Sequence, residues 1–354
     1  MSAVVRVREV LARSMILRSV AWVLLAAIVL AILSEVAGAY QDLQLATGAY
    51  YFAVLAGLTV LAGQSGQISL GHGALMAVGA YTFALLVGNE GWALVPAIVA
   101  AVLVTAVIGI PVGAAASRLR GPYLAGVTLA FAVGLPALAD KFPATFGGEN
   151  GLTINPPVPL SFLGSSFPLE QWEAWIACAG ALVVLFALLN LTGSGVGRAL
   201  RAVRDDEIAA SLCGLRVGRT HTLAFVVSAG CAGLGGALLA VVLQGAVPGA
   251  FPLQLSLTLL TGVVLGGLGS LVGAIWGAAL LTLLPNWTTD LAGSFSLSTR
   301  VTENLSPAIY GIVLIGAMIL WPTGIQGGVR SVSARLRDRR AQGSRAAESA
   351  GEQS

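Results

Sequence analysis

The sequence is short of charge: only 10% of its 354 residues are Asp, Glu, Lys or Arg, while 56% are hydrophobic. Soluble domains carry about 25% charged residues. Too few charges remain to coat a soluble globule of this length, so a bilayer must be the solvent for most of the chain. The arginines do not cluster with aromatic residues on a soluble segment, so we expect no nucleic-acid partner.

Lysine, histidine and cysteine are also scarce. Lys141 is the only lysine and follows Asp140. A P-loop needs Gly-Lys-Ser/Thr, whose lysine reaches the nucleotide phosphates. We therefore predict no ATPase site, no bound cofactor and no metal. The two histidines, on separate elements, disfavour a membrane enzyme. The three cysteines fit neither a disulfide framework nor a zinc spacing and are predicted to be unpaired; they are Cys178, Cys213 and Cys231.

Long apolar runs dominate what is present. A membrane span needs roughly 20 apolar residues at about 1.5 Å of rise each. The sequence therefore predicts an all-α integral membrane protein of about ten spans. The eighth and ninth predicted spans are short and joined only by Gly269, so they could form one broken or re-entrant pair. The predicted spans are 17–39, 42–62, 70–88, 92–116, 122–139, 172–191, 221–244, 254–268, 270–285 and 306–321.

Basic residues predict the orientation, because they favour the cytoplasmic side of short loops. With both ends cytoplasmic, all of the 19 basic residues except Lys141 and Arg300 fall inside. The chain then divides into a cytoplasmic segment 1–16, a membrane domain 17–328 and a basic tail 329–354. The tail is expected to anchor the orientation beside anionic lipid. The first span resembles a signal peptide, but its length favours an uncleaved helix.

A charged segment, residues 192–220, interrupts the apolar pattern. It contains five arginines and the acidic run Asp205, Asp206 and Glu207. We expect these acids near a helix N-terminus, where they complement the helix dipole. The small residues Ala209, Ala210 and Gly214 would let another surface approach closely. The alternative is a solvated helix fixed by pairs of arginines and acids.

This segment resembles the cytoplasmic coupling loop of ATP-binding-cassette importer permeases, in which Glu-Ala-Ala and three further residues precede a glycine. Ala209 to Gly214 fit this pattern, but Ile208 takes the place of the glutamate. Residues 197–204 and 224–229 are similar to the branched-chain amino-acid permease family, LivM type. The resemblance implies contacts between this loop and a separate ATPase subunit; the implied residues are Arg204, Asp205, Asp206, Glu207, Ala209, Ala210 and Gly214.

A second motif, residues 63–73, combines glycines with polar side chains at membrane depth. On a helix, Ser65, Ser69 and His72 would share one face, with Gln64 and Gln67 beside it. Polar groups in a span usually face protein or a water-filled path. We expect either a translocation path or helix packing with a turn. The motif is similar to the LivM-type signature Gly-x-x-Gly-x-x-Ser-Leu-Gly, which Gly-Ala-Tyr follows.

Two further segments are rich in glycine. Gly269, Gly273 and Gly277 continue a small-residue spacing from Gly262 and Gly266, which predicts close helix packing. The predicted outer loop, residues 140–170, includes Gly-Gly-Glu-Asn-Gly-Leu-Thr, which resembles a family segment after the fifth span. It is either a plain turn structure or a contact for a substrate-binding protein.

Together these resemblances imply a permease subunit of an importer for branched-chain or related amino acids, in the bacterial inner membrane. The implied partners are two ATPase subunits, a second LivH-like permease and a periplasmic or lipid-anchored binding protein. Urea, amides or small carboxylates are alternative substrates. A secondary transporter or channel is an alternative of another class, but it predicts ionisable residues within spans. The acids Glu35 and Asp290 lie near span ends and not mid-span.

Overall fold

The computed structural model of the chain describes residues 15–118, 122–159, 167–294 and 324–329, with scattered positions between 309 and 331. It is helical almost throughout. The elements are α2 (Met15–Val36), α3 (Ala39–Leu58), the π-helical η1 (Thr59–Gln64), α4 (His72–Gly88), α5 (Leu94–Ala116), α6 (Pro122–Lys141), α7 (Pro143–Phe146), η2 (Gly148–Asn150), β1 (Leu152–Thr153), α8 (Leu169–Gly193), α9 (Gly195–Asp205), α10 (Glu207–Leu212), α11 (Val217–Val242), β2 (Gly245–Ala246), η4 (Pro248–Ala250), α12 (Leu253–Gly266) and α13 (Leu271–Ser294).

Within this described part, seven helical segments are long and apolar enough to cross a membrane, or eight if the bent pair α6–α7 is one span. The apolar α4 is shorter, at 17 residues. Each of the first nine predicted spans coincides with a helix, while most of the tenth, 306–321, lies outside the described residues. The chain is thus a multi-pass helical membrane protein. The count of ten spans and the cytoplasmic position of both ends stay predictions.

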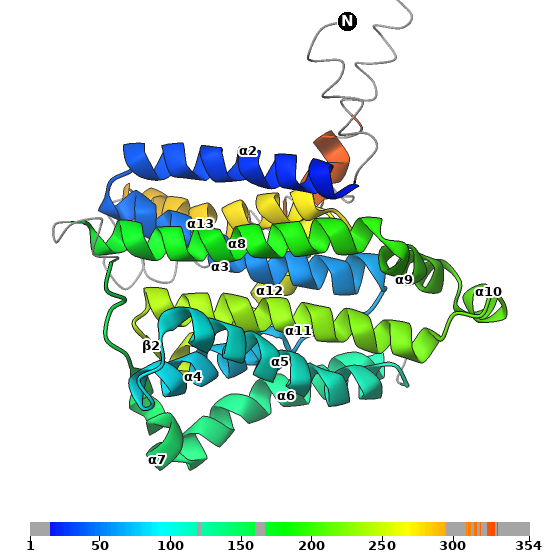
Figure 1. The fold of residues 1–354 in the computed structure, drawn as a ribbon, viewed down its shortest axis with the longest axis horizontal. Coiled ribbons are helices and arrows are strands. Elements are labelled where there is room, and N and C mark those ends of the chain that lie inside the picture. Colours follow the sequence, from blue (N-terminus) through cyan, green and yellow to red (C-terminus); the bar gives the residue numbers. More distant parts are fainter. Residues whose placement is uncertain are drawn as a thin grey trace, which may run out of the picture.

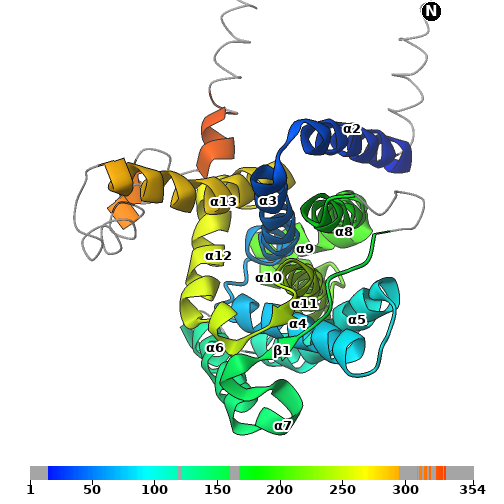
Figure 2. The ribbon, with the colours of Figure 1, turned by 90° about the vertical axis from the view of Figure 1, so that its left-hand side faces the viewer.

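The helices α3 and α11 form the centre of the bundle (Figure 2). The apolar stretches of α11 and of α3 with η1 are 83% and 72% buried, whereas that of α2 is only 6% buried. Glycines allow this central packing, because small residues let helix backbones approach closely. A Cβ on Gly79 of α4 would overlap the carbonyl of Gly233 in α11, and one on Gly236 would overlap the carbonyl of Met76.

The charged segment, residues 192–220, and the described part of the predicted outer loop 140–170 lie at opposite ends of the bundle (Figure 1). The helices α9 and α10 extend beyond one end, and α7 with the β1–β2 pair lies at the other. This antiparallel pair joins Leu152 to Ala246 and is the small exception to the predicted all-α fold in the described residues. The arrangement agrees with placing segments 192–220 and 140–170 on opposite sides of a membrane.

The helices α12 and α13 are two separate elements, joined by residues 267–270. Figure 2 shows them from the side while α3, α8 and α11 are seen nearly end-on, so α12 and α13 cross the bundle axis obliquely. They meet through glycine: a Cβ on Gly273 would lie 2.6 Å from the carbonyl oxygen of Gly267, and one on Gly277 would overlap the carbonyl of Gly262. Gly269 has φ +81°, a conformation that favours glycine.

Candidate coupling and translocation site

Two short helices form the charged segment, and each starts at a side-chain cap. The Ser194 hydroxyl accepts a hydrogen bond from the backbone N–H of Val196 and so caps α9. The Asp206 carboxylate accepts from the N–H groups of Ile208 and Ala209, at 2.8 and 3.0 Å, and caps α10. Such caps satisfy N–H groups that have no partner within the helix. Asp206 therefore fixes where α10 begins.

The three consecutive acids have three different partners. Asp205 holds the guanidinium of Arg204 at 2.9 Å, and Asp206 caps α10. The Glu207 carboxylate lies 3.4 Å from Nε2 of His221. All three acids lie near the N-terminus of α10, as expected, although Asp205 is also the last residue of α9. The extended backbone of Asp206, with φ −158°, separates the two helices.

An apolar pair dominates the outer surface of α10. The side chains of Ile208 and Leu212 are 74% and 83% exposed, and their spacing of four residues places them on one face. Of the two predicted alanines, Ala209 is exposed but Ala210 is buried. Sequence reasoning missed Ile208 and Leu212, although an i, i+4 apolar pair on a short charged helix was a usable signal. Gly214 follows α10 with φ +85° and open space around it.

The polar motif of residues 63–73 is a helix break between the predicted spans 42–62 and 70–88, and not one helix that would place Ser65, Ser69 and His72 on a single face. The π-helical η1 ends at Gln64, Gly66 has φ +74°, and α4 starts only at His72. Ser69 and His72 still meet, with 3.0 Å between Oγ and Nδ1. Ser65 instead turns towards α11. Glycine explains the break, because a positive φ at residue 66 suits no other residue as well.

Other elements hold this break at several points. The His72 ring contacts the Ser228 hydroxyl at 2.7 Å, and the backbone N–H of Gly73 donates to Ser256 Oγ. The backbone N–H of Leu70 donates to Thr128 Oγ1. All five predicted polar residues are buried. The side-chain oxygens of Gln64 and Gln67 are buried with no hydrogen-bond partner among the described residues.

Two contacts join the charged segment to the helix break. The guanidinium of Arg204 donates to the backbone carbonyl of Gly63. The His221 ring bridges the other contact: its Nδ1 lies 2.9 Å from Ser65 Oγ, and its Nε2 faces Glu207. Two regions that the sequence presents as separate motifs are therefore in direct contact in the fold.

The match to a known family covers most of the chain. Residues 40–320 match the family model described as branched-chain amino acid transport system / permease component. The chain belongs to this permease family. No solved structure matches the chain.

Individual members of the permease family are also similar to the chain in sequence. The chain is 36% identical over 249 residues to the high-affinity branched-chain amino acid transport system permease protein LivM of Salmonella typhimurium and 35% identical to that of Escherichia coli. Each match covers 64% of this chain but 58% of the relative, so the chain spans less than two thirds of the LivM proteins. The LivH permease of Escherichia coli is 26% identical over 79% of this chain and 92% of its own length.

No group of His, Cys, Asp and Glu in the described ranges could hold a metal ion. Cys178 and Cys231 are buried in α8 and α11, and Cys213 is exposed just after α10.

Proposed function

We propose that the chain is a membrane-spanning permease subunit of an ATP-binding-cassette importer for branched-chain or related amino acids. The family match over residues 40–320 supports this function. The relatives named LivM and LivH support the substrate class and a pair of permeases, one of them LivH-like. Two separate ATPase subunits would supply the energy, so the chain needs no nucleotide site, and the location is the bacterial inner membrane.

The observation that carries the coupling role is the exposed apolar pair on α10. The helix α10, which carries the exposed Ile208 and Leu212, lies at the end of the bundle, beyond the apolar helices (Figure 1). Burying each such side chain contributes about 1.5–3 kcal/mol, which a docked protein would supply. Exposed Ala209 and Gly214 add room for close approach. We therefore assign α10 as the surface that docks on an ATPase subunit.

The proposed translocation path runs beside the helix break. An unpaired buried polar group costs about 1–3 kcal/mol, and the side-chain oxygens of Gln64 and Gln67 are two such groups. Water or the ammonium group of an amino acid would supply the missing donors. Ser65, Ser69 and His72 would shape the break through their hydrogen bonds.

The opposite end of the helix bundle would receive the binding protein. Residues 151–154 are tied to the end of α11: β1 pairs with β2, and the backbone N–H of Ile154 donates to the carbonyl of Gln244 at 2.9 Å. A Cβ on Gly151 would overlap the carbonyl of Ala246. This attachment would give an arriving protein a firm surface in contact with the central helix.

Cross-linking at Cys213 in native membranes tests the function. This thiol is exposed beside α10, whereas Cys178 and Cys231 are buried, so a thiol-reactive cross-linker should act at one site. We expect an ATPase subunit cross-linked at Cys213, with a second permease and a binding protein in the same purified complex. The Cys213→Ser variant is the control. An intact chain that traps no ATPase would instead support an ATP-independent transporter.

A further inference from the structure

The contacts between the charged segment and the helix break form two parallel links. The first is Arg204, which leaves the last turn of α9 and donates to the carbonyl of Gly63. This carbonyl lies in the last turn of η1, where carbonyls have no partner within the helix. Asp205 holds the same guanidinium through Nε and Nη2, at 3.0 and 2.9 Å. The Arg204 guanidinium is therefore held on two sides, by the Gly63 carbonyl and by the Asp205 carboxylate.

The second link is the chain Glu207, His221 and Ser65. A neutral imidazole with its proton on Nε2 satisfies both contacts, because it donates to the Glu207 carboxylate and accepts from the Ser65 hydroxyl. His221 is buried, while Glu207 is partly exposed as the first residue of α10. The link therefore runs from the surface of α10 to a buried position in the helix break.

We propose that Arg204 and His221 are the positioning residues that convert movement of α10 into movement of the helix break at residues 63–73. This inference rests on the proposed function. The two links flank Asp206, the cap of α10, so a shift of α10 pulls on Gly63 and Ser65 together. Gly63 in turn packs on Gly269, and Gly73 is bonded to Ser256 of α12. Movement of the break therefore reaches α12 and α13 as well.

The test uses the whole transporter, reconstituted in liposomes with its ATPases and binding protein. We expect His221→Ala to retain the ATPase subunits and ATP hydrolysis but to lower amino-acid uptake per ATP at least tenfold. Arg204→Ala should show the same loss of uptake per ATP hydrolysed, whatever amount of ATPase it binds. Arg204→Lys, which keeps a donor, should recover part of the loss. The matched control is Arg201→Ala, on the same helix, because Arg201 donates to Thr192 of its own segment.

A double-variant cycle separates transmission from folding. If His221 acts through Ser65, the Ser65→Ala variant should reproduce the loss, and the double variant should be no worse than either single one. Additive losses, or wild-type uptake per ATP in Arg204→Ala, would overturn the inference. These outcomes differ from failure of the proposed function, in which the wild-type chain itself would bind no ATPase.

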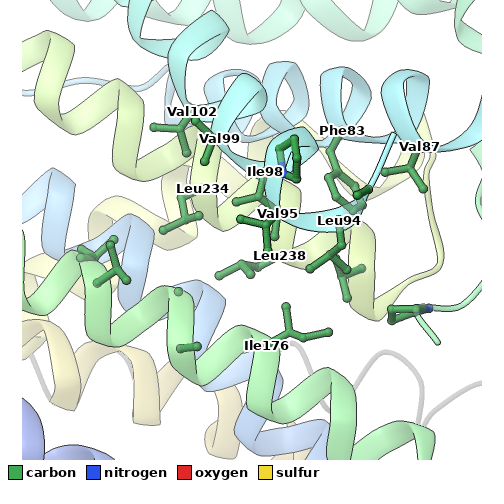
Figure 3. Close-up of a pocket in the computed structure, with 18 of the residues that line it drawn as sticks. Phe83, Val87, Leu94, Val95, Ile98, Val99, Val102, Ile176, Leu234 and Leu238 are labelled. Atoms are coloured by element: carbon green, nitrogen blue, oxygen red, sulfur yellow. The ribbon is translucent and has the colours of Figure 1, made fainter. Parts of the chain in front are cut away.

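An apolar groove carries a second inference, independent of transport. It lies between α5 and α8 with α11 behind it and has a volume of about 1360 Å³. Typical small-molecule pockets have about 300–1,000 Å³. Figure 3 shows aliphatic side chains from the helices around this groove; among them are Val95, Ile98, Val99, Ile176, Leu234 and Leu238.

The shape and position of the groove suit a lipid tail. Along α5 the lining runs from Leu94 to Ala106, about 18 Å at 1.5 Å per residue, against about 15 Å for half of the hydrocarbon core. Its polar end holds Asn155 and Trp172, whose indole N–H is buried without a partner among the described residues. The helices α2 and α5 lie on either side of α8 (Figure 2), and only 6% and 22% of their apolar stretches are buried, so this side of the bundle is open to lipid.

We infer that the groove binds an acyl chain of a phospholipid from the leaflet on the side of segment 140–170. An ester or phosphate oxygen of the same lipid accepts the Trp172 N–H. A phospholipid fits both ends of the groove, because it joins a long apolar chain to hydrogen-bond acceptors at the membrane surface.

Photo-labelling of the reconstituted transporter tests this site with a phosphatidylethanolamine whose acyl chain carries a diazirine. We expect labelled peptides from α5, α8 and α11, and at least a fivefold loss of this labelling in Ala179→Trp, which fills the groove from α8. Ala31→Trp, on the exposed face of α2, is the matched control. Equal labelling of α2 without an effect of Ala179→Trp would show annular lipid only. If residues of the groove cross-link to a second permease subunit and not to the lipid, a protein occupies the groove and the inference is overturned.

Discussion

Gly63 and Gly269 pack backbone against backbone, so closely that a Cβ on Gly63 would overlap the amide nitrogen of Gly269. Two irregular stretches of the chain therefore meet at one point: the end of η1 and the turn between α12 and α13. Irregular backbone inside a membrane domain is tolerated where protein covers it. Each of these stretches covers the other, and this contact explains why both need glycine.

Gly63→Ala should therefore lower the stability of the permease. Overpacking of this kind typically costs about 1–3 kcal/mol, and the neighbouring atoms here are backbone, which cannot move aside cheaply. We expect a lower thermal unfolding temperature for the purified complex. Gly134→Ala in α6 is the matched control, since no atom lies within 4 Å of the added Cβ and alanine favours the helix. Equal unfolding temperatures for the two variants would contradict the packing.

Ile208→Ser and Leu212→Ser should weaken the binding of the ATPase subunits. Each change removes apolar area that would be buried on docking, worth about 1.5–3 kcal/mol per side chain, so we expect at least tenfold weaker binding. The measurement is the amount of ATPase that co-purifies at fixed permease concentration. Leu243→Ser provides the control, because Leu243 is an exposed leucine as well, at 53%, but it follows the other end of α11. Undiminished binding would remove α10 from the docking surface.

Gln67→Leu should separate transport from stability. The change removes a buried oxygen that has no partner among the described residues, and replacing such a group with an apolar one of similar shape is close to neutral or stabilising. We expect an unchanged or higher unfolding temperature together with much slower amino-acid uptake. Gln64→Leu should behave in the same way. If uptake simply follows the amount of folded protein, these residues pack the break and do not line a path.

The sequence predicts the helices and the position of the break, but not how the break is built. Apolar length identifies α5, α8 and α11 to within a few residues, because the bilayer sets the length of a span. The predicted spans 42–62 and 70–88 leave residues 63–69 outside both, but periodicity does not show that Ser65 turns towards α11 while Ser69 contacts His72. What decides it is tertiary: Thr128 and Ser256 accept the backbone N–H groups that a helix would otherwise use.

A single sequence also does not predict which distant residue a given side chain contacts. The acidic run at 205–207 is visible as a motif, but its division into three roles depends on where α11 places His221. The same limit applies to Arg204, whose acceptor is a backbone carbonyl 141 residues away. Backbone carbonyls carry no residue-specific signal. In contrast, the exposed pair Ile208 and Leu212 could have been predicted, although it was missed, because a spacing of four residues on a helix places both side chains on one face.

Asp206→Ala should unwind α10 without affecting the membrane helices. The Asp206 carboxylate accepts two backbone N–H groups at the start of this six-residue helix, and loss of an N-cap costs about 0.5–2 kcal/mol. A helix this short has little other stabilisation. We expect faster hydrogen exchange at residues 207–212 and weaker ATPase binding, with unchanged exchange in α11. Asp206→Ser, which can still cap, should behave like the wild type, and Asp205→Ala should leave α10 protected because Asp205 bonds Arg204 instead. Equal exchange rates in Asp206→Ala and Asp206→Ser would show that docking contacts, and not the cap, hold α10 in shape.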